Sequence, residues 1–288
     1  MDYDYYVGID IGSTGSKVAV VDGKSLVHYF NFPTGWNSKE TANEIYRRLK
    51  EKSFTENMRC VATGYGRICV DYADKVVTEI TCHGRGAYAL FEKDCTVIDV
   101  GGQDTKIITL ENGQVIDFLM NDKCAAGTGK FIEIMANRLG ATFEELYDIA
   151  KKGNPLSISS MCTVFAESEV ISHIGAGEKR EDIASGVISS VAERVANLCK
   201  RHGVGNEVFL TGGLSGMPYF IEVLSKKLNR DIKTHPLSRY AGAIGAALNT
   251  SVIIFSPAHG TKNGGDRYIG FIFLFQQTVA VYRKNGNG

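Results

Sequence analysis

The stretch Asp10-Ile-Gly-Ser-Thr-Gly-Ser-Lys17 is repeated in pattern 89 residues later by Asp99-Val-Gly-Gly-Gln-Asp-Thr-Lys106. Each copy follows a short apolar run and leads through a second β-type segment to a turn dipeptide, Asp22-Gly23 or Asn112-Gly113, and then to a third β-type segment. Both dipeptides favour type I′ hairpin turns. Two copies of strand, glycine-rich turn and hairpin predict a duplicated α/β protein.

The rest of the chain alternates between helical and strand patterns. Apolar or small residues at helical spacing predict helices that include 42–49, 132–139, 182–202, 221–228 and 241–248. Short buried strands are expected at 59–63 and 207–211, and a Gly-Gly pair follows the second. This alternation predicts helices packed on mixed sheets in two related halves.

The composition restricts the function classes. The 288 residues carry 32 Lys and Arg against 32 Asp and Glu, so there is no overall positive field for nucleic acid or membrane surfaces. Apolar runs are too short for a membrane span, and the acidic start at Asp2 and Asp4 is unlike a signal peptide. We therefore expect a cytoplasmic protein, whose seven cysteines are core residues, metal ligands or catalysts. In the tail 250–288, the apolar run 269–275 is either an added strand or an aggregation-prone stretch, and no chemistry is visible there.

The two glycine-rich turns have the composition of phosphate-binding loops. Glycine lets backbone N–H groups approach an anion, and the carboxylates of Asp10 and Asp99 suit Mg²⁺ or its bound waters. Gln103 and Asp104 could orient an attacking water or the metal shell. The candidate catalytic residues are Asp10, Asp99 and Gln103. The candidate nucleotide-binding residues are Gly12, Ser13, Thr14, Gly15, Ser16, Lys17, Gly101, Gly102, Asp104, Gly212, Gly213 and Arg239.

Ordinary polar turns are the alternative, but the repeated Asp and Lys in register favour phosphate binding. The first turn is not a dinucleotide fingerprint, because Gly8, Gly12 and Gly15 do not have the spacing G-x-G-x-x-G. The segment Gly127-Thr-Gly-Lys130 resembles the end of a Walker A loop, but Phe131 stands where a Ser or Thr is required. A third glycine turn, Leu210-Thr-Gly-Gly-Leu-Ser215, could accept a base or sugar, or could be a plain strand–helix turn. The three turns together resemble the acetate and sugar kinase, heat-shock chaperone and actin superfamily.

That resemblance implies an α/β, actin-like and ribonuclease H-like fold of two duplicated domains with a nucleotide cleft between them. Domain I would comprise 1–94 plus about 236–249, and domain II would comprise 95–235. The segment 250–288 would be an atypical tail outside both domains.

Two cysteines stand just before predicted helices, Cys124 within 121–133 and Cys162 within 159–171. A helix N-terminus favours a thiolate, and its N–H groups can donate to the sulfurs of an iron–sulfur cluster. One chain offers only two such positions, whereas a 4Fe–4S cluster normally takes four thiolates, which a twofold dimer would supply. Because no C-x-x-C occurs, spacing alone also allows buried or incidental thiols.

Both cysteine segments closely resemble the activator (component A) of 2-hydroxyacyl-CoA dehydratases, in the BadF/BadG/BcrA/BcrD-type ATPase family. The likeness covers about 5–249 and includes Gly8-Ile-Asp-Ile-Gly-Ser-Thr14, Ala62-Thr-Gly-Tyr-Gly-Arg67 and Val97-Ile-Asp-Val-Gly-Gly-Gln-Asp104. It implies a homodimer that holds one 4Fe–4S cluster through Cys124 and Cys162 of each subunit and binds ATP or ADP with Mg²⁺. The tail and Lys130, where Arg is commoner, depart from the family pattern.

The resemblance further implies that ATP hydrolysis drives an electron from the cluster into an iron–sulfur 2-hydroxyacyl-CoA dehydratase or a related reductase. Ferredoxin or flavodoxin would supply the electron, and neither nucleic acid nor a membrane is expected as a partner. Two alternatives are a sugar or carboxylate kinase of the same superfamily, with Asp99 as general base, and a non-redox ATPase switch. A zinc-bridged dimer is a variant of the cysteine site.

The remaining cysteines are interpreted as structural: Cys60, Cys69, Cys82, Cys95 and Cys199. Cys82-His83 is the pair most like a separate metal site, with His83 placed before an expected Gly-Arg-Gly turn. A lone Cys-His pair is more often packing or a hydrogen bond, so the role of His83 stays open.

Overall fold

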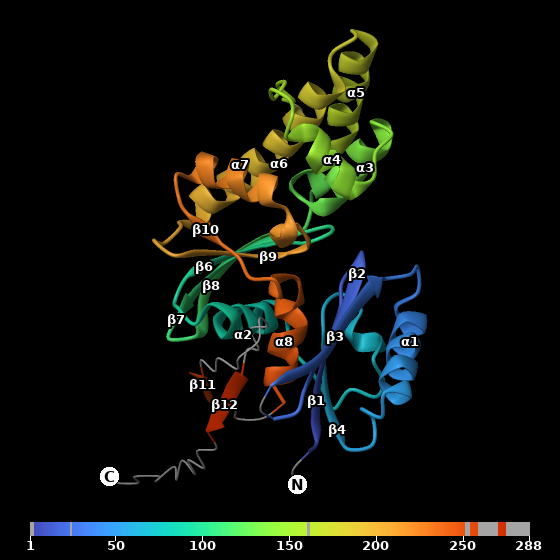
Figure 1. Ribbon diagram of the computed structural model, residues 1–288, viewed down its shortest axis with the longest axis vertical. Helices are drawn as coiled ribbons and strands as arrows, with labels where there is room; N and C mark the ends of the chain where they lie inside the picture. Colours follow the sequence, from blue (N-terminus) through green and yellow to red (C-terminus); the bar gives the residue numbers. More distant parts are fainter. Residues whose placement is uncertain (1–2, 24, 160–161, 251–253, 259–269, 275–288) are drawn as a thin grey trace, which may run out of the picture.

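The computed structural model describes residues 3–23, 25–159 and 162–250, and the backbone of 254–258 and 270–274. Two five-stranded sheets lie one above the other along the longest axis (Figure 1). The first sheet has the order β3-β2-β1-β4-β5. Its strands are β1 (Tyr5–Ile11), β2 (Gly15–Val21), β3 (Leu26–Pro33), β4 (Met58–Thr63) and β5 (Lys75–Val76).

The second sheet repeats this plan in the order β10-β9-β6-β7-β8. Its strands are β6 (Thr96–Val100), β7 (Thr105–Glu111), β8 (Gln114–Asn121), β9 (Val208–Gly212) and β10 (Ile232–Lys233). In each sheet an antiparallel three-stranded unit is followed by a parallel neighbour, since β1 pairs with β4 and β6 with β9. The registers also correspond, because Asp10 is opposite Lys17 and Asp99 is opposite Lys106. The duplicated α/β fold with mixed sheets is thereby confirmed.

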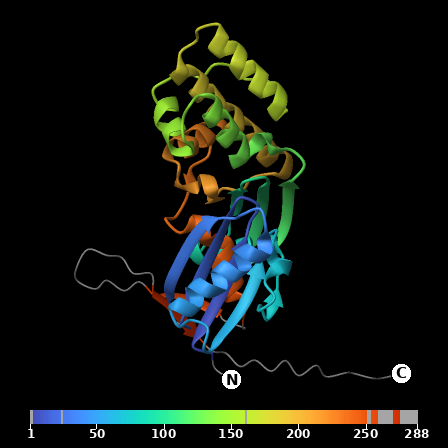
Figure 2. The same cartoon turned by 90° about the vertical axis from the view of Figure 1, so that its right-hand side faces the viewer.

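Helices cover the outer faces of both sheets and fill the space between them. The helices are α1 (Ser38–Glu51), α2 (Glu79–Phe91), α3 (Gly129–Arg138), α4 (Phe143–Ala150), α5 (Thr163–Gly175), α6 (Arg180–His202), α7 (Pro218–Leu228) and α8 (Ala241–Leu248). The short 3₁₀ helices are η1 (Arg67–Cys69), η2 (Ala125–Gly127), η3 (Gly213–Gly216) and η4 (Ser238–Tyr240). Figure 2 shows α1 lying across one face of the first sheet, where Ala42, Ile45 and Leu49 join its core. The helices α6 and α7 pack against the second sheet, and α3, α4 and α5 pack on α6 at the end of the molecule beyond it (Figure 1).

The helices α2 and α8 connect the two sheets (Figure 1). Their backbones approach closely: a Cβ atom on Gly86 would lie 1.9 Å from the carbonyl oxygen of Ala241, and one on Gly245 would lie 1.8 Å from that of Cys82. A Cβ on Gly8 in β1 would likewise lie 1.9 Å from the carbonyl oxygen of Ala243. Glycine is therefore required where these three elements meet, as the small residues of 241–248 had indicated.

The two hairpin dipeptides differ. Asn112 and Gly113 both have positive φ, 52° and 71°, as a type I′ turn requires. Asp22 does not, so the expectation of a type I′ turn at Asp22-Gly23 is wrong. Its carboxylate instead accepts a 2.8 Å hydrogen bond from the Ser25 backbone N–H.

The C-terminal part contributes two paired strands, β11 (Ile254–Ala258) and β12 (Gly270–Leu274). The strand β12 lies within the apolar run 269–275, whose end residues fall outside the described part of the chain. Among the described residues, no helix is both long and apolar enough to span a bilayer.

Candidate functional site

The two glycine-rich turns face each other where the sheets meet. A Cβ atom on Gly102 would lie 2.1 Å from Oγ1 of Thr14, so the second turn can approach the first only with glycine at this position. Asp10 precedes the first turn at the end of β1, and Asp99 precedes the second near the end of β6. The structure thus brings the two predicted phosphate turns and their carboxylates together.

Asp10 is buried, with 1% of its surface exposed. Lys17 Nζ lies 3.7 Å from its Oδ2, but Oδ1 has no hydrogen-bond partner among the described residues. Gly64, with φ of 84°, leaves the space beside Oδ1 open, because a Cβ there would lie 2.4 Å from it. A buried carboxylate oxygen without a donor fits a site that is completed by the waters of a bound cation.

Asp99 is equally buried but well partnered. Thr211 Oγ1 donates a 3.1 Å hydrogen bond to its Oδ1, and Lys106 Nζ donates a 3.3 Å bond to its Oδ2. Burial by itself raises the pKa of Asp99, but the charges of His83, Lys106 and Lys17 outweigh it and lower the pKa to about 2. Asp99 is therefore a fixed negative charge at neutral pH.

Lys106 is a buried ammonium with three carboxylate neighbours. Only 1% of its surface is exposed, and Nζ lies 2.8 Å from Asp104, 3.1 Å from Glu79 and 3.3 Å from Asp99. Burial lowers the pKa of Lys106, yet these carboxylates raise it well above its ordinary value. Burial also raises the pKa of Asp104, against the attraction of Lys106.

The oxygen and nitrogen atoms of Glu79, His83 and Asp99 lie close enough together to hold a metal ion. Lys106 already supplies the positive charge there, because its ammonium lies within ion-pair distance of both carboxylates. We therefore interpret the cluster as ion-paired rather than metal-binding. The repeat had indicated Lys106 through its match to Lys17, but Glu79 and Thr211 carried no such signal.

Cys82 and His83 do not form a joint site. Both lie on α2, and the expected Gly-Arg-Gly turn after His83 is wrong, since Gly84, Arg85 and Gly86 continue the helix. Cys82 Sγ accepts a 3.9 Å hydrogen bond from Asn249 Nδ2, whereas His83 lies between Asp10 and Asp99.

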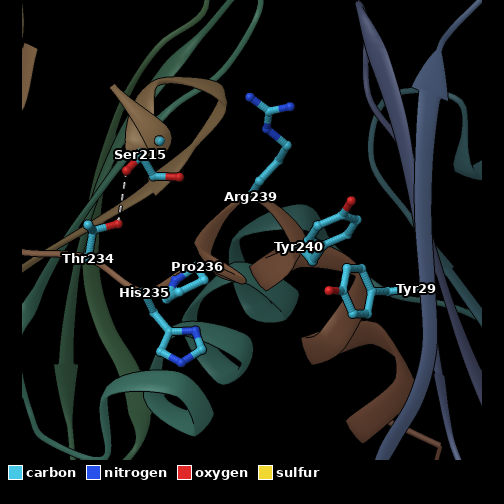
Figure 3. Close-up of a pocket in the computed structure, with 8 residues that line it drawn as sticks. Tyr29, Ser215, Thr234, His235, Pro236, Arg239 and Tyr240 are labelled. Carbon is cyan, nitrogen blue, oxygen red and sulfur yellow. Dashed lines mark hydrogen bonds between the residues drawn. The ribbon is translucent and has the colours of Figure 1, made fainter. Parts of the chain in front are cut away.

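The third glycine turn borders both Asp99 and a cavity. Gly212 has φ of 82°, and a Cβ there would lie 2.7 Å from Asp99 Oδ1. Arg239 Nη2 donates a 3.4 Å hydrogen bond to the carbonyl of Gly213. The cavity beside them holds about 510 Å³ and is shown in Figure 3; its lining residues are Tyr29, Ser215, Gly216, Thr234, His235, Pro236, Arg239 and Tyr240. Aromatic side chains and an arginine around an open space suit a flat ring.

The other predicted nucleotide residues occupy the turns as expected from the chain order. Ser16 is buried, and its hydroxyl is hydrogen-bonded to that of Thr34 at 2.7 Å. Gln103 is exposed at the second turn. Four residues of the first turn are half-buried: Gly12, Ser13, Gly15 and Lys17.

Among the seven cysteines, Cys124 and Cys162 are exposed. Cys162 is the residue that precedes α5, and Cys124 precedes η2 and then α3. Cys69 is half-buried, and the other four are buried; burial raises the pKa of Cys82, Cys95 and Cys199 to about 12 and that of Cys60 further. Inert, protonated thiols in the core match the structural role predicted for these four.

The second turn is bonded directly to the segment that follows Cys124. The backbone N–H of Gly129 donates to Gly101 O at 3.0 Å, and that of Lys130 donates to Gly102 O at 2.9 Å. In addition, Thr105 Oγ1 donates a buried 2.8 Å hydrogen bond to the carbonyl of Gly127. The turn and the start of α3 therefore form one hydrogen-bonded unit.

Comparison with a ROK family glucokinase from Streptomyces griseus shows the fold alone, with 14% identity and a TM-score of 0.54 over 85% of this chain and 98% of that one. A closer structure is an activator of 2-hydroxyisocaproyl-CoA dehydratase from Clostridium difficile, solved with bound ADPNP. It is 39% identical, with a TM-score of 0.81 over 85% of this chain and 94% of that one.

Sequence comparison gives the same relationship. The chain is 44% identical over 249 residues to the (R)-2-hydroxyglutaryl-CoA dehydratase activating ATPase of Acidaminococcus fermentans, which covers 85% of this chain and 96% of that protein. It is 38% identical over 269 residues to one of the subunits of benzoyl-CoA reductase from Thauera aromatica, over 84% of this chain and 91% of that protein. The family profile itself matches residues 7–250. The chain therefore belongs to the BadF/BadG/BcrA/BcrD ATPase family.

Proposed function

We propose that this protein is an ATP-hydrolysing activator that drives an electron from a 4Fe–4S cluster, held between two copies of the chain, into a 2-hydroxyacyl-CoA dehydratase or a related CoA-ester reductase. Family membership and the names of its relatives support ATP-dependent activation. The observation that supports the coupling most directly is the bonding of the second turn to the segment after Cys124.

The nucleotide would bind with its phosphates between the two turns. The first turn, with Gly12, Ser13, Thr14, Gly15, Ser16 and Lys17, would hold the phosphates through N–H groups, hydroxyls and the Lys17 ammonium. Asp10, whose Oδ1 has no donor in the part of the chain that the structure describes, would accept from waters of the bound Mg²⁺. Gly101, Gly102, Gln103 and Asp104 would surround the terminal phosphate, with Gln103 orienting the water that attacks it.

The base and ribose would lie in the cavity beside the third turn. Gly212 and Gly213 give a backbone surface without side chains, and Arg239 reaches across it. The cavity of about 510 Å³ is large enough for a nucleoside. Burial lowers the pKa of His235 in its wall, so this imidazole is neutral at neutral pH.

The exposed Cys124 and Cys162 fit a shared iron–sulfur cluster by the chemistry of their donor set. Two copies of the chain related by a twofold axis would bring four thiolates together. The cluster would supply a one-electron redox centre. The first backbone N–H groups of α5, which the Cys162 side chain does not cap, remain available to a sulfur ligand.

The effect of ATP hydrolysis on the cysteines would be transmitted by movement of the second turn. Contacts of 101–104 with the terminal phosphate would change when that phosphate leaves. Because Gly101 and Gly102 bond the first residues of α3, a movement of the turn must shift α3 and the segment that begins at Cys124. The electron would come from ferredoxin or flavodoxin, in a cytoplasmic protein without nucleic-acid or membrane partners.

The test is the iron and acid-labile sulfide content of protein purified without oxygen. We expect one cluster per two chains, with loss in Cys124→Ser and in Cys162→Ser, and retention in the control Cys69→Ser. Asp10→Ala and Asp99→Ala should abolish ATP turnover and retain the cluster. Colourless, iron-free native protein after anaerobic reconstitution would contradict the proposal, and ADP release that depends on a sugar or carboxylate would indicate a kinase instead.

A further inference from the structure

His83 lies in the middle of the candidate nucleotide site, although neither glycine-rich turn contains it. It is carried by α2, the helix that packs against the second sheet and against α8. Only 3% of its surface is exposed. The role of this buried imidazole is not explained by the phosphate turns or by the cysteines.

The two ring nitrogens of His83 point to carboxylates from different sheets. Nδ1 lies 3.4 Å from Oδ1 of Asp99, and Nε2 lies 4.0 Å from Oδ2 of Asp10. Nε2 also lies 3.9 Å from Glu79, one helical turn earlier. Among the described residues, no other basic side chain lies within ion-pair distance of both aspartates.

These contacts are incomplete in the present arrangement. His83 Nδ1 and Asp10 Oδ1 are both buried, and neither has a hydrogen-bond partner among the described residues. Buried polar atoms are normally satisfied, and hydrogen bonds of catalytic groups are often long until the substrate binds. A small movement on nucleotide binding would shorten the contact between His83 Nδ1 and Asp99 Oδ1.

The surroundings of His83 keep this space clear. A Cβ atom on Gly242 of α8 would lie 2.8 Å from both His83 Nε2 and Asp10 Oδ2. Glycine at this position therefore allows the imidazole and the carboxylate to share one pocket. Lys106 neutralises Asp99 and Glu79 from another side, so His83 is not needed as their counter-charge.

We propose that His83 is a positioning residue for ATP hydrolysis. When the nucleotide binds, the Nδ1–H of His83 donates to Asp99, and its ring fixes Asp99 relative to Asp10, the carboxylate proposed to accept from the waters of Mg²⁺. This inference rests on the proposed nucleotide role of the two aspartates. Misplacement of a catalytic group by about 1 Å can cost on the order of 100-fold in rate.

The test compares His83→Leu with His83→Asn, because the asparagine amide can donate from near the position of Nδ1. We expect kcat for ATP to fall at least about 10-fold in His83→Leu, with KM for ATP changed by less than about threefold, since base and ribose contacts lie elsewhere. In His83→Asn most of the lost kcat should return.

The matched control is His202→Leu. The side chain of His202, like that of His83, is 4% exposed. It is hydrogen-bonded to Thr109 at 2.8 Å and lies 3.7 Å from Asp117, on the opposite face of the second sheet. This variant should lower the melting temperature and leave kcat unchanged.

The proposal is overturned if His83→Leu keeps its kcat, if the loss appears in KM alone, or if His83→Asn is as impaired as His83→Leu. The iron content and ATP turnover of the native protein distinguish failure of this proposal from failure of the proposed function. Native protein that holds iron and hydrolyses ATP, with normal kcat in His83→Leu, refutes only the role of His83. Retention of ATP turnover in Asp10→Ala and Asp99→Ala refutes the assignment of the nucleotide site itself.

Discussion

Lys17 and Lys106 occupy equivalent positions in the two repeats but have different surroundings. Each lies opposite an aspartate across an antiparallel ladder. The side chain of Lys17 is 21% exposed and lies 3.7 Å from Asp10, whereas Lys106 is buried among three carboxylates. The partly exposed Lys17 ammonium can therefore reach a ligand, whereas the buried Lys106 ammonium holds the surrounding carboxylates together.

The difference predicts unequal effects on stability. Lys106→Met would leave Asp99, Asp104 and Glu79 without their shared cation and should cost about 3–5 kcal/mol of the free energy of unfolding. Lys17→Met breaks a longer, partly solvated pair and should cost about 0–1 kcal/mol. Denaturant titration of both variants measures this, and equal losses would show that Lys106 is not the charge that holds the cluster.

At the scale of elements, the side chains of β7 alternate between the two faces of the second sheet, and each face contacts a different part of the candidate site. Lys106, Ile108 and Leu110 face α2, whereas Ile107 and Thr109 face α6. Thr105 at the start of the strand bonds the carbonyl of Gly127, just before α3. The strand therefore contacts the carboxylate cluster on one side and the cysteine-bearing segment on the other.

Removal of the Thr105 hydroxyl should weaken the coupling between nucleotide and cluster. Thr105→Val leaves the buried carbonyl of Gly127 without its donor, at a cost of about 1–3 kcal/mol in the free energy of unfolding. We expect ATP hydrolysis and iron content to persist, while the change in the cluster spectrum between ADP and ATP becomes smaller. Thr109→Val on the same strand, which breaks only the bond to His202, is the control and should keep the native spectral response. An unaltered response in Thr105→Val would place the coupling elsewhere.

At the scale of the whole molecule, the sequence predicts the two repeated turns and sheets but not the contacts between them. The Asp and Lys of each turn predicted the two sheets and the meeting of their phosphate turns, because the same pattern folds in the same way twice. The sequence could not show that Cys82 and His83 contact different parts of the molecule. This follows from their place on a helix, where successive side chains point about 100° apart. The burial of Lys106 depends on Glu79, and the space around His83 depends on Gly242. These contacts join segments far apart in the chain, for which periodicity carries no signal.

The contact between α2 and α8, which connects the two sheets, should therefore be especially sensitive to substitution. At Gly245 a Cβ atom would lie 1.8 Å from the carbonyl oxygen of Cys82, a backbone atom that cannot move aside without displacing α2. We expect Gly245→Ala to cost about 1–3 kcal/mol or more in the free energy of unfolding and to lower ATP turnover, because displacing α2 also displaces His83. Gly175→Ala is the matched control: nothing lies within 4 Å of that position at the end of α5, so the same substitution should be neutral or stabilising by up to about 1 kcal/mol. If both variants unfold at the same denaturant concentration, then α2 and α8 can separate freely and do not hold the two sheets in a fixed relation.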